Sequence, residues 1–150
     1  MENNFTAILI DDEESARDVL SNLLIRFCPT ITLLGKYSNV ESAVKGIEEH
    51  KPDVVFLDIE MPNYAGYEII NFFPEIDFEI IFVTAYDKYA IKAFEISAVD
   101  YLLKPIEIDR LKKAVDKLKH KVLSKGVNKL QLLEETLKSN TVSSIIITDK

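Results

Sequence analysis

The sequence predicts an α/β fold in which a doubly wound, five-stranded parallel sheet lies between helices. Apolar runs and helical segments alternate five times along the chain, and the apolar runs are continuous rather than alternating with polar residues. Continuous apolar runs are typical of strands buried on both faces, as in parallel sheets covered by helices. Polar residues directly follow four of the five runs. They can therefore share the sheet edge at which open α/β folds bind their ligands.

The expected strands are the five apolar runs, at residues 7–10, 31–36, 54–57, 80–83 and 101–103. The first helix is expected over apolar positions 16–27, before Pro29, and the second opens with a capping-box pattern at residues 38–41. Three more helices are expected at residues 66–73, at 88–95, and from about 107 to beyond 122. The common strand order for this pattern is 2-1-3-4-5, which makes the fold flavodoxin-like.

The last 26 residues have a different pattern. Gly126 is expected to interrupt the final helix, after which the spacing of Leu130, Leu133 and Leu137 resumes a helical pattern. Residues 139–141 form a polar break before the β-branched run at 145–147, which is typical of a strand. We therefore divide the chain into one domain at residues 1–124 and a linker helix at 125–150, with the possible start of a further domain.

The charge is unevenly distributed along the chain. Residues 1–103 carry 7 basic and 19 acidic side chains, whereas residues 104–150 carry 11 and 6. An acidic surface repels nucleic acid, and a lysine-rich solvent face on the last helix accounts for the basic part, so no direct DNA contact is predicted. Cys28 is the only cysteine, the first residues do not resemble a signal peptide, and no apolar stretch approaches membrane-spanning length. A cytoplasmic location, without membrane contact, is expected.

Polar residues suited to metal and phosphate follow four of the strands. They are Asp11 and Asp12 after residues 7–10, Asp58 after 54–57, Thr84 after 80–83, and Lys104 after 101–103. Each has a simpler explanation alone. Asp11, Asp12 or Thr84 could cap a helix, Asp58 could be a turn residue, and Lys104 could end a strand at the surface. All of them together, at one edge of a parallel sheet, favour a common site.

Three carboxylates gathered at this edge would repel one another unless a cation joined them. Mg²⁺ is the expected cation because it takes oxygen ligands and binds through carboxylates, water and phosphate, and there is no His–Cys cluster to favour zinc. Asp58 is the expected nucleophile, since aspartate can form an aspartyl phosphate. Thr84 would donate a hydrogen bond to the phosphoryl group, and Lys104 would neutralise charge.

Over residues 5–123 the chain closely resembles the receiver domain of bacterial response regulators. The segment from Asp58 to Gly66, with its Met-Pro pair at positions 61 and 62, resembles the family's phosphorylation-site motif. Thr84 followed by alanine resembles the switch threonine, and Tyr101 resembles the switch aromatic residue. Lys104-Pro105 resembles the family's lysine, which is usually joined to proline by a cis peptide bond.

The resemblance implies a role for each residue of the site. Asp58 would accept phosphate from a sensor histidine kinase, in a transfer that the receiver itself catalyses with Thr84 and Lys104 as phosphoryl contacts. The Mg²⁺ ligands would be Asp11, Asp12, Asp58 and the backbone carbonyl of Glu60. Tyr101 would turn inward as Thr84 moves, and the surface formed by residues 88–95, 101–103 and 107–122 would repack, often to form a homodimer.

A narrower resemblance concerns regulators with a LytTR-type DNA-binding domain. Residues 86–95 and 98–106 resemble the corresponding segments of those regulators. Such proteins place a linker helix after the receiver and then a β-rich output domain, so residues 125–150 would be the linker, with 145–147 as the first output strand. The chain would contain too little of that domain to bind DNA itself.

Two other functions fit the same residues. A phosphatase of the haloacid dehalogenase type also uses an aspartate nucleophile, a threonine and a lysine. It places the nucleophile after the first strand in an Asp-x-Asp arrangement, whereas here Asp11 is followed directly by Asp12 and Glu13. A stand-alone receiver that acts by docking to other proteins is the second alternative. As a receiver, whether of a LytTR-type regulator or standing alone, the chain is not expected to be a metabolic enzyme. The sequence does not identify the kinase, its signal or the regulated genes.

Overall fold

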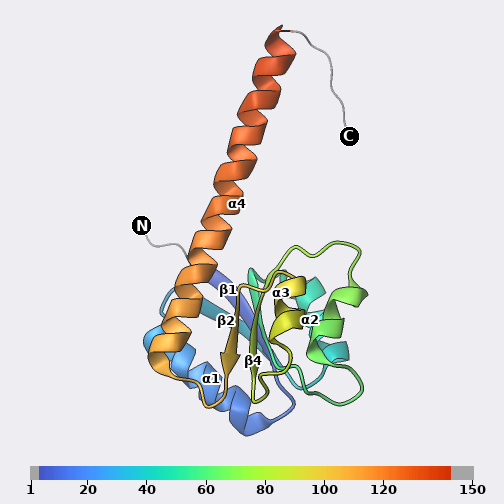
Figure 1. Cartoon of the computed structure of the whole chain (residues 1–150), viewed down its shortest axis with the longest axis vertical. Coiled ribbons are helices and arrows are strands. Elements are labelled where there is room, and N and C mark those ends of the chain that lie inside the picture. The colour runs from blue at the N-terminus through green and yellow to red at the C-terminus, as the bar shows by residue number, and fades with distance from the viewer. Residues whose placement is uncertain (1–3, 143–150) are drawn as a thin grey trace. The chain divides into compact units, whose positions relative to one another are not determined.

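Five parallel strands form one sheet in the computed structural model, which describes residues 4–142 (Figure 1). The strands are β1 (Phe5–Ile10), β2 (Ile31–Tyr37), β3 (Val54–Leu57), β4 (Glu79–Thr84) and β5 (Asp100–Leu103). Their order is β2-β1-β3-β4-β5, which confirms the predicted order 2-1-3-4-5 and the flavodoxin-like class. The strands buried at the centre of the sheet are the continuous apolar runs from which the fold was predicted.

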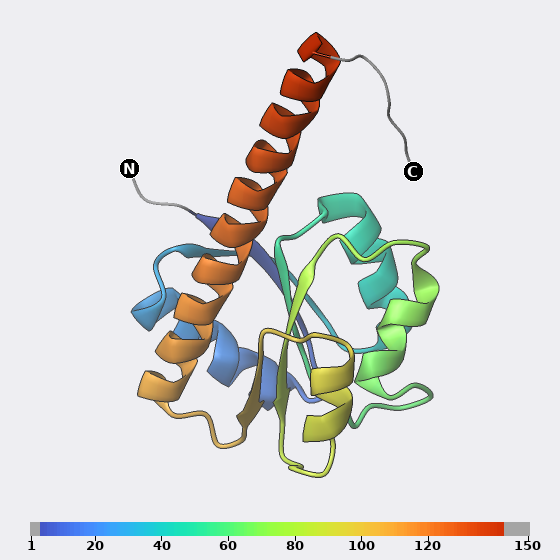
Figure 2. The ribbon, with the colours of Figure 1, turned by 45° about the horizontal axis from the view of Figure 1, so that its top comes forward.

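The helices cover both faces of the sheet, in line with the prediction. In Figures 1 and 2, α1 (Glu14–Phe27) and the beginning of α4 (Ile108–Val142) lie on one face. The helix α2 (Val40–His50), the 3₁₀-helix η1 (Gly66–Phe72) and α3 (Ala90–Glu95) lie on the other. A fully buried apolar cluster joins this second layer to the sheet; it includes Ile10, Val40, Leu57, Ile69 and Phe82.

Several predicted local features differ in the structure. The helix predicted at 66–73 is a 3₁₀-helix that ends at Phe72, and the helix predicted at 88–95 begins only at Ala90. Asn39, rather than Ser38, caps α2, because its side-chain oxygen accepts a hydrogen bond from the backbone N–H of Ser42 at 2.8 Å. These differences affect helix ends and type but leave the order of elements unchanged.

The predicted breaks in the last helix are wrong, because α4 is continuous from Ile108 to Val142. A single glycine costs a helix only about 1 kcal/mol relative to alanine. The lysine, leucine, glutamine and glutamate residues around Gly126 are strong helix formers that offset this cost. The strand predicted at 145–147 lies outside the described residues.

The chain divides into two compact units, residues 1–118 and 119–150. The first contains the sheet and its helices, and the second contains the rest of α4. Within residues 4–142, no helix combines the length and the apolar character needed to cross a membrane.

Candidate functional site

Strand register brings the ends of β1 and β3 together. Ile10 pairs with Leu57 at the last step of these two parallel strands. The ladder then continues by one residue, since the backbone N–H of Asp58 donates to the carbonyl of Ile10 at 3.0 Å. On the other side of β1, the N–H of Asp11 donates to the carbonyl of Tyr37 at 3.0 Å. The backbones of Asp11 and Asp58 are therefore fixed by sheet hydrogen bonds rather than by a flexible loop.

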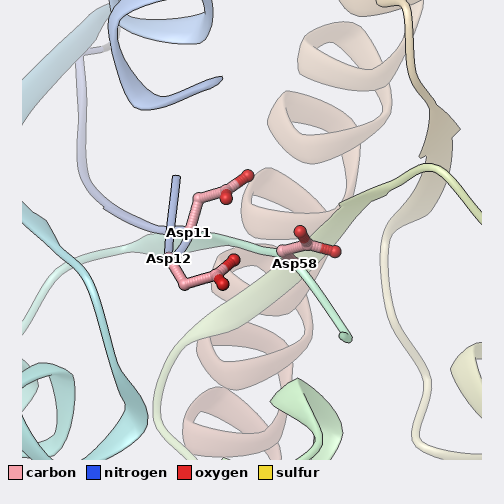
Figure 3. Close-up of side chains that lie close together, drawn as sticks. All are labelled: Asp11, Asp12 and Asp58. Atoms are coloured by element: carbon pink, nitrogen blue, oxygen red, sulfur yellow. The ribbon is translucent and has the colours of Figure 1, made fainter. Parts of the chain in front are cut away.

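The carboxylates of Asp11, Asp12 and Asp58 form one cluster at this edge (Figure 3). One oxygen from each lies within 4.8 Å of the others. Asp11 and Asp58 are buried, whereas Asp12 is exposed. The structure thus brings together all three carboxylates that the sequence predicted as neighbours, and it leaves the cluster open to solvent on the side of Asp12.

Lys104 reaches the same cluster from the end of β5. Its Nζ atom lies 2.6 Å from Asp11 Oδ2 and 3.1 Å from Asp58 Oδ2. Burial disfavours the ammonium ion, but hydrogen bonds and charge attraction from the two aspartates outweigh this and hold the pKa of Lys104 above its ordinary value. Lys104 is therefore charged at neutral pH, and it bridges two carboxylates instead of ending a strand at the surface.

The negative charge of the Asp58 carboxylate is only partly balanced in this arrangement. Its Oδ1 accepts the N–H of Ile59 at 2.7 Å, and its Oδ2 accepts Lys104. Burial raises the pKa of Asp58, Lys104 lowers it, and the neighbouring Asp11 raises it again, so that the net direction is upward. A carboxylate with this balance is stabilised by any additional cation at the site. It is also not the simple turn residue considered above, since it is buried.

Asp11 is oriented by the start of α1. Its Oδ1 accepts the N–H of Glu13 at 3.0 Å, and its backbone carbonyl accepts Arg17 at 2.6 Å. The N-cap of α1 is Glu13, so neither Asp11 nor Asp12 caps this helix. Sequence analysis did not identify Arg17, because its contact is to a backbone atom six residues earlier and leaves no pattern of residue types.

Gly66 allows the chain after Asp58 to fold back against the site. Its N–H donates to the carbonyl of Ile59 at 2.7 Å. A Cβ atom at this position would lie 1.9 Å from the backbone carbonyl oxygen of Asp58, which is an impossible contact. The sequence motif included this glycine, but only the structure shows that it is needed for close approach of two backbone segments.

Thr84 lies beside the carboxylate cluster, whereas Tyr101 lies further back on the neighbouring strand β5, where it pairs with Phe82. Thr84 is the last residue of β4 and is fully buried, and a hydrogen bond from its side chain lowers the pKa of Asp58 against the larger effect of burial. It is not a helix cap, because α3 begins six residues later with Tyr89 as its N-cap. The Tyr101 ring packs at 6.2 Å from that of Phe82, and its hydroxyl donates to the carbonyl of Tyr86.

The side chain of Glu60 is directed to the β4–α3 loop. It accepts a hydrogen bond from the hydroxyl of Tyr89 and lies 3.9 Å from the Nζ atom of Lys88. The hydrogen bond to Glu60 raises the pKa of Tyr89 to about 12. Glu60 was predicted as a metal ligand through its backbone carbonyl, which these side-chain contacts leave available. The Lys104-Pro105 bond is cis, as the resemblance implied.

The donor set fits a hard divalent cation. Three carboxylates lie together and one ammonium group contacts two of them, which leaves negative charge in excess, and each of the three side chains offers an oxygen atom as ligand. In the part of the chain that the structure describes, no histidine or cysteine joins this group. Magnesium prefers oxygen ligands of this kind and keeps several waters, so these residues are suited to hold it.

Comparison with known proteins agrees with this geometry. Residues 7–116 match the response regulator receiver domain family. A response regulatory protein of Vibrio cholerae is 49% identical over 114 residues, which cover 75% of this chain and 48% of that protein. The transcriptional regulatory protein BtsR of Salmonella typhi is 41% identical over 132 residues, covering 87% and 55%. The chain thus spans about half the length of the curated relatives it matches.

Solved structures show the same fold. The response regulatory domain of protein mrkE from Klebsiella pneumoniae superposes with a TM-score of 0.69 at 30% identity, covering 77% of this chain and 95% of that one. The receiver domain of AraT from Geobacillus stearothermophilus gives 0.71 at 27% identity, covering 81% and 98%. From the family match over most of its length and the carboxylate cluster at its sheet edge, we conclude that the chain belongs to the response regulator receiver domain family of two-component systems.

Proposed function

We propose that the chain accepts a phosphoryl group on Asp58 from a sensor histidine kinase. An oxygen of Asp58 attacks the phosphorus of the phosphohistidine, the P–N bond breaks, and the histidine nitrogen keeps the electron pair and takes up a proton. The product is an aspartyl phosphate. The observation that carries this proposal is the buried, undercompensated Asp58 carboxylate, which lies 3.1 Å from Lys104 and beside Asp11 and Asp12.

The surrounding residues have separate tasks. Lys104 offsets the like charge between the attacking carboxylate and the incoming phosphoryl group, and afterwards pairs with a phosphoryl oxygen. Thr84 donates its hydroxyl to another phosphoryl oxygen. Asp11, Asp12, Asp58 and the carbonyl of Glu60 would hold Mg²⁺, which receiver domains generally use and which supplies further neutralisation of phosphoryl charge. The chain catalyses only its own phosphorylation and dephosphorylation.

A small pocket of about 280 Å³ adjoins the site and offers a place for the kinase to dock. It is lined by Ala16, Val19 and Leu20 of α1 together with Lys104, Pro105 and Ile106. Val19 is 53% exposed, so part of the apolar lining of this pocket is open to solvent. A partner with an apolar helix face could cover this surface while presenting a phosphohistidine to Asp58.

The most direct experiment measures the intact mass of the protein after incubation with acetyl phosphate, with and without Mg²⁺. We expect the wild type to gain one phosphoryl group only with Mg²⁺, and Asp58→Asn to gain none. Asp87→Asn is the matched control, because Asp87 is an exposed carboxylate on the neighbouring β4–α3 loop. Equal phosphorylation of the wild type and Asp58→Asn would refute the proposal. Turnover of a generic phosphomonoester that survives Asp58→Asn would favour the phosphatase alternative.

We further propose that phosphorylation acts on the surface formed by α3, β5 and the start of α4. Inward movement of Thr84 would break the hydrogen bond between the Tyr101 hydroxyl and the Tyr86 carbonyl and let Tyr101 turn. Ile91 and Phe94 on α3 and Leu103 on β5 are 75%, 85% and 47% exposed. These side chains form an apolar surface suited to a homodimer. At a protein concentration at which the unphosphorylated chain is monomeric, beryllofluoride with Mg²⁺ should double the mass measured by light scattering, and Phe94→Ser should prevent this.

The output of the switch is proposed to be transcriptional. The relatives are about twice as long as the aligned region, and BtsR is a transcriptional regulatory protein. The likeness of residues 86–95 and 98–106 to LytTR-type regulators supports an output domain of that type, with DNA bound only through that domain. A stand-alone receiver that acts by docking is the alternative, and the gene sequence downstream of residue 150 distinguishes the two. A cytoplasmic location fits either case.

A further inference from the structure

The second unit of the chain carries exposed leucines at regular intervals. Within residues 119–142, Leu123, Leu133 and Leu137 are 48%, 56% and 57% exposed. Single exposed apolar residues are ordinary, but a repeated set on one helix is not. Stable helices of this length in proteins normally bury an apolar face, since helix propensity alone is marginal in water.

The spacing of these leucines follows a heptad. Leu123, Leu130 and Leu137 are separated by seven residues each, and Leu133 lies three after Leu130. If the first three leucines are assigned to position a, Leu133 falls at position d. Positions a and d form the seam of a coiled coil. The helix is continuous through Gly126, so the heptad frame is kept across all four residues.

The charges flanking this seam are self-complementary. In the same frame, residue 129 is a lysine at position g, and Glu134 is at position e of the following heptad. In a parallel pair of helices, position g of one strand lies next to the following e position of the other. Two copies of this helix would therefore form the same lysine–glutamate pair twice. The flanking positions 122 and 127 are both valine, which carry no charge to repel.

We propose that residues 119–142 of two copies of this chain pair in parallel as a two-stranded coiled coil. The seam has four leucines, and the other d positions of this segment are Lys119, Gly126 and Asn140, so the pairing is weaker than that of a free-standing coil of four heptads. It does not require phosphorylation of Asp58. Its effect would be to hold two receiver domains at a high effective concentration, which lowers the concentration at which their own surfaces associate.

The test compares the same substitution at two adjacent leucines in the chain of 150 residues. Leu133→Lys places a charge at position d, whereas Leu132→Lys changes the same residue type at position c, outside the seam. Sedimentation velocity across micromolar to millimolar protein measures the dimer dissociation constant. We expect Leu133→Lys to weaken dimerisation at least about a hundredfold, because two leucines lose their burial, and Leu132→Lys to leave it within about threefold of wild type.

A charge exchange tests the parallel orientation. Glu134→Lys should weaken the dimer roughly three- to fivefold, and the added substitution Lys129→Glu should restore it. Glu135→Lys, at the outward f position, should have no effect. Under oxidising conditions Leu133→Cys should form an intermolecular disulfide, since identical d positions meet in a parallel dimer, and Leu132→Cys should not. The native Cys28 is buried in the receiver, so the unsubstituted chain gives the background level of disulfide-linked dimer in this experiment.

All measurements are made without Mg²⁺ or phosphodonor and repeated in Asp58→Asn, so that their outcome is independent of the proposed phosphoryl transfer. A chain that stays monomeric at millimolar concentration would overturn the proposal. So would equal effects of the Leu132 and Leu133 substitutions, or a charge exchange that fails to restore pairing. Circular dichroism confirms that each variant keeps its receiver fold.

Discussion

Asp58 and Asp100 are both buried carboxylates that contact cationic side chains, yet the charge balance around them is opposite. Asp58 shares a single lysine with Asp11, and Asp12 lies in the same cluster. Asp100 alone receives both a guanidinium and an ammonium group. At the first carboxylate anionic charge is in excess, and at the second cationic charge is in excess.

The Asp100 cluster has close, well-aligned contacts. Arg110 donates from two nitrogens to the two oxygens of Asp100, at 2.7 and 2.6 Å. Lys117 lies at 3.2 Å, and the N–H of Tyr101 donates at 2.8 Å. Burial alone would raise the pKa of Asp100, but these hydrogen bonds outweigh it and the pKa is lowered. Asp100 therefore stabilises the packing of β5 against the start of α4.

The two carboxylates thus belong to a structural ion cluster, at Asp100, and to a candidate functional site, at Asp58. The cations around Asp100 satisfy its carboxylate within the protein, so no ligand is needed. Around Asp58 the pKa is raised because burial and Asp11 outweigh Lys104. This imbalance supports the proposed binding of a cation and a phosphoryl group, and it carries a cost in stability while they are absent.

Magnesium binding should give the largest change in stability, and only the cluster around Asp58 should be needed for it. A cation that binds only the folded chain stabilises it by about 2.7 kcal/mol when its free concentration is 100 times the dissociation constant. We expect Mg²⁺ to raise the melting temperature of the wild type and of Asp100→Asn equally. Asp12→Asn should need much more Mg²⁺ for the same rise, as scanning calorimetry in a magnesium series would show. A rise that is unchanged in Asp12→Asn would mean that the ion binds elsewhere.

Asp100→Asn should lower the free energy of unfolding by about 2 kcal/mol at neutral pH, because Arg110 and Lys117 lose a charged acceptor. This loss of unfolding free energy is smaller than for a fully buried ion pair, because the side chains of Arg110 and Lys117 are 39% and 57% exposed. Urea denaturation measures the change. Asp116→Asn is the matched control, since Asp116 is an exposed carboxylate on the same helix. If Asp100→Asn and Asp116→Asn lowered the free energy of unfolding equally, Asp100 would have no special structural role.

The contribution of Asp100 should also depend on pH. Its pKa is lower in the folded chain than the ordinary value of 3.8, so its stabilisation is present above that value and is lost as the pH falls through the lowered folded-state pKa. The difference in unfolding free energy between wild type and Asp100→Asn should therefore be constant from pH 7 to about 5 and shrink below about pH 4. Denaturation series at each pH would show this. A difference that disappears already between pH 7 and 5 would contradict it.

Asp58→Asn should have the smallest effect, and in the opposite direction. Because the folded pKa of Asp58 is raised, its ionised form is disfavoured in the folded chain at neutral pH, and this penalty is relieved as the pH falls. Removing the charge should raise the unfolding free energy without Mg²⁺ by about 1 kcal/mol. Thermal unfolding in the presence of a chelator measures the shift. A lower melting temperature would show that Lys104 compensates Asp58 fully.

The sequence was sufficient to place most of the candidate site. Asp11, Asp12, Asp58, Thr84 and Lys104 lie together because each ends or follows a strand, and parallel strands bring these positions to one edge. The apolar runs predicted the strands, and the order of the strands in the sheet was predicted from the arrangement common to doubly wound folds, which the structure confirms. The same reasoning could not identify Arg17 or Arg110, since a long side chain can reach many partners and only packing selects one.

By itself, then, the sequence determined the alternation of elements and the polar residues that follow the strands, because hydrophobic periodicity is encoded locally, whereas the strand order was predicted from the arrangement common to this alternation. Only the tertiary structure decided two further features. Gly66 is needed because the backbone passes the Asp58 carbonyl too closely for a Cβ atom. Asp58 and Asp100 differ in charge balance because residues far apart in the chain meet around each of them.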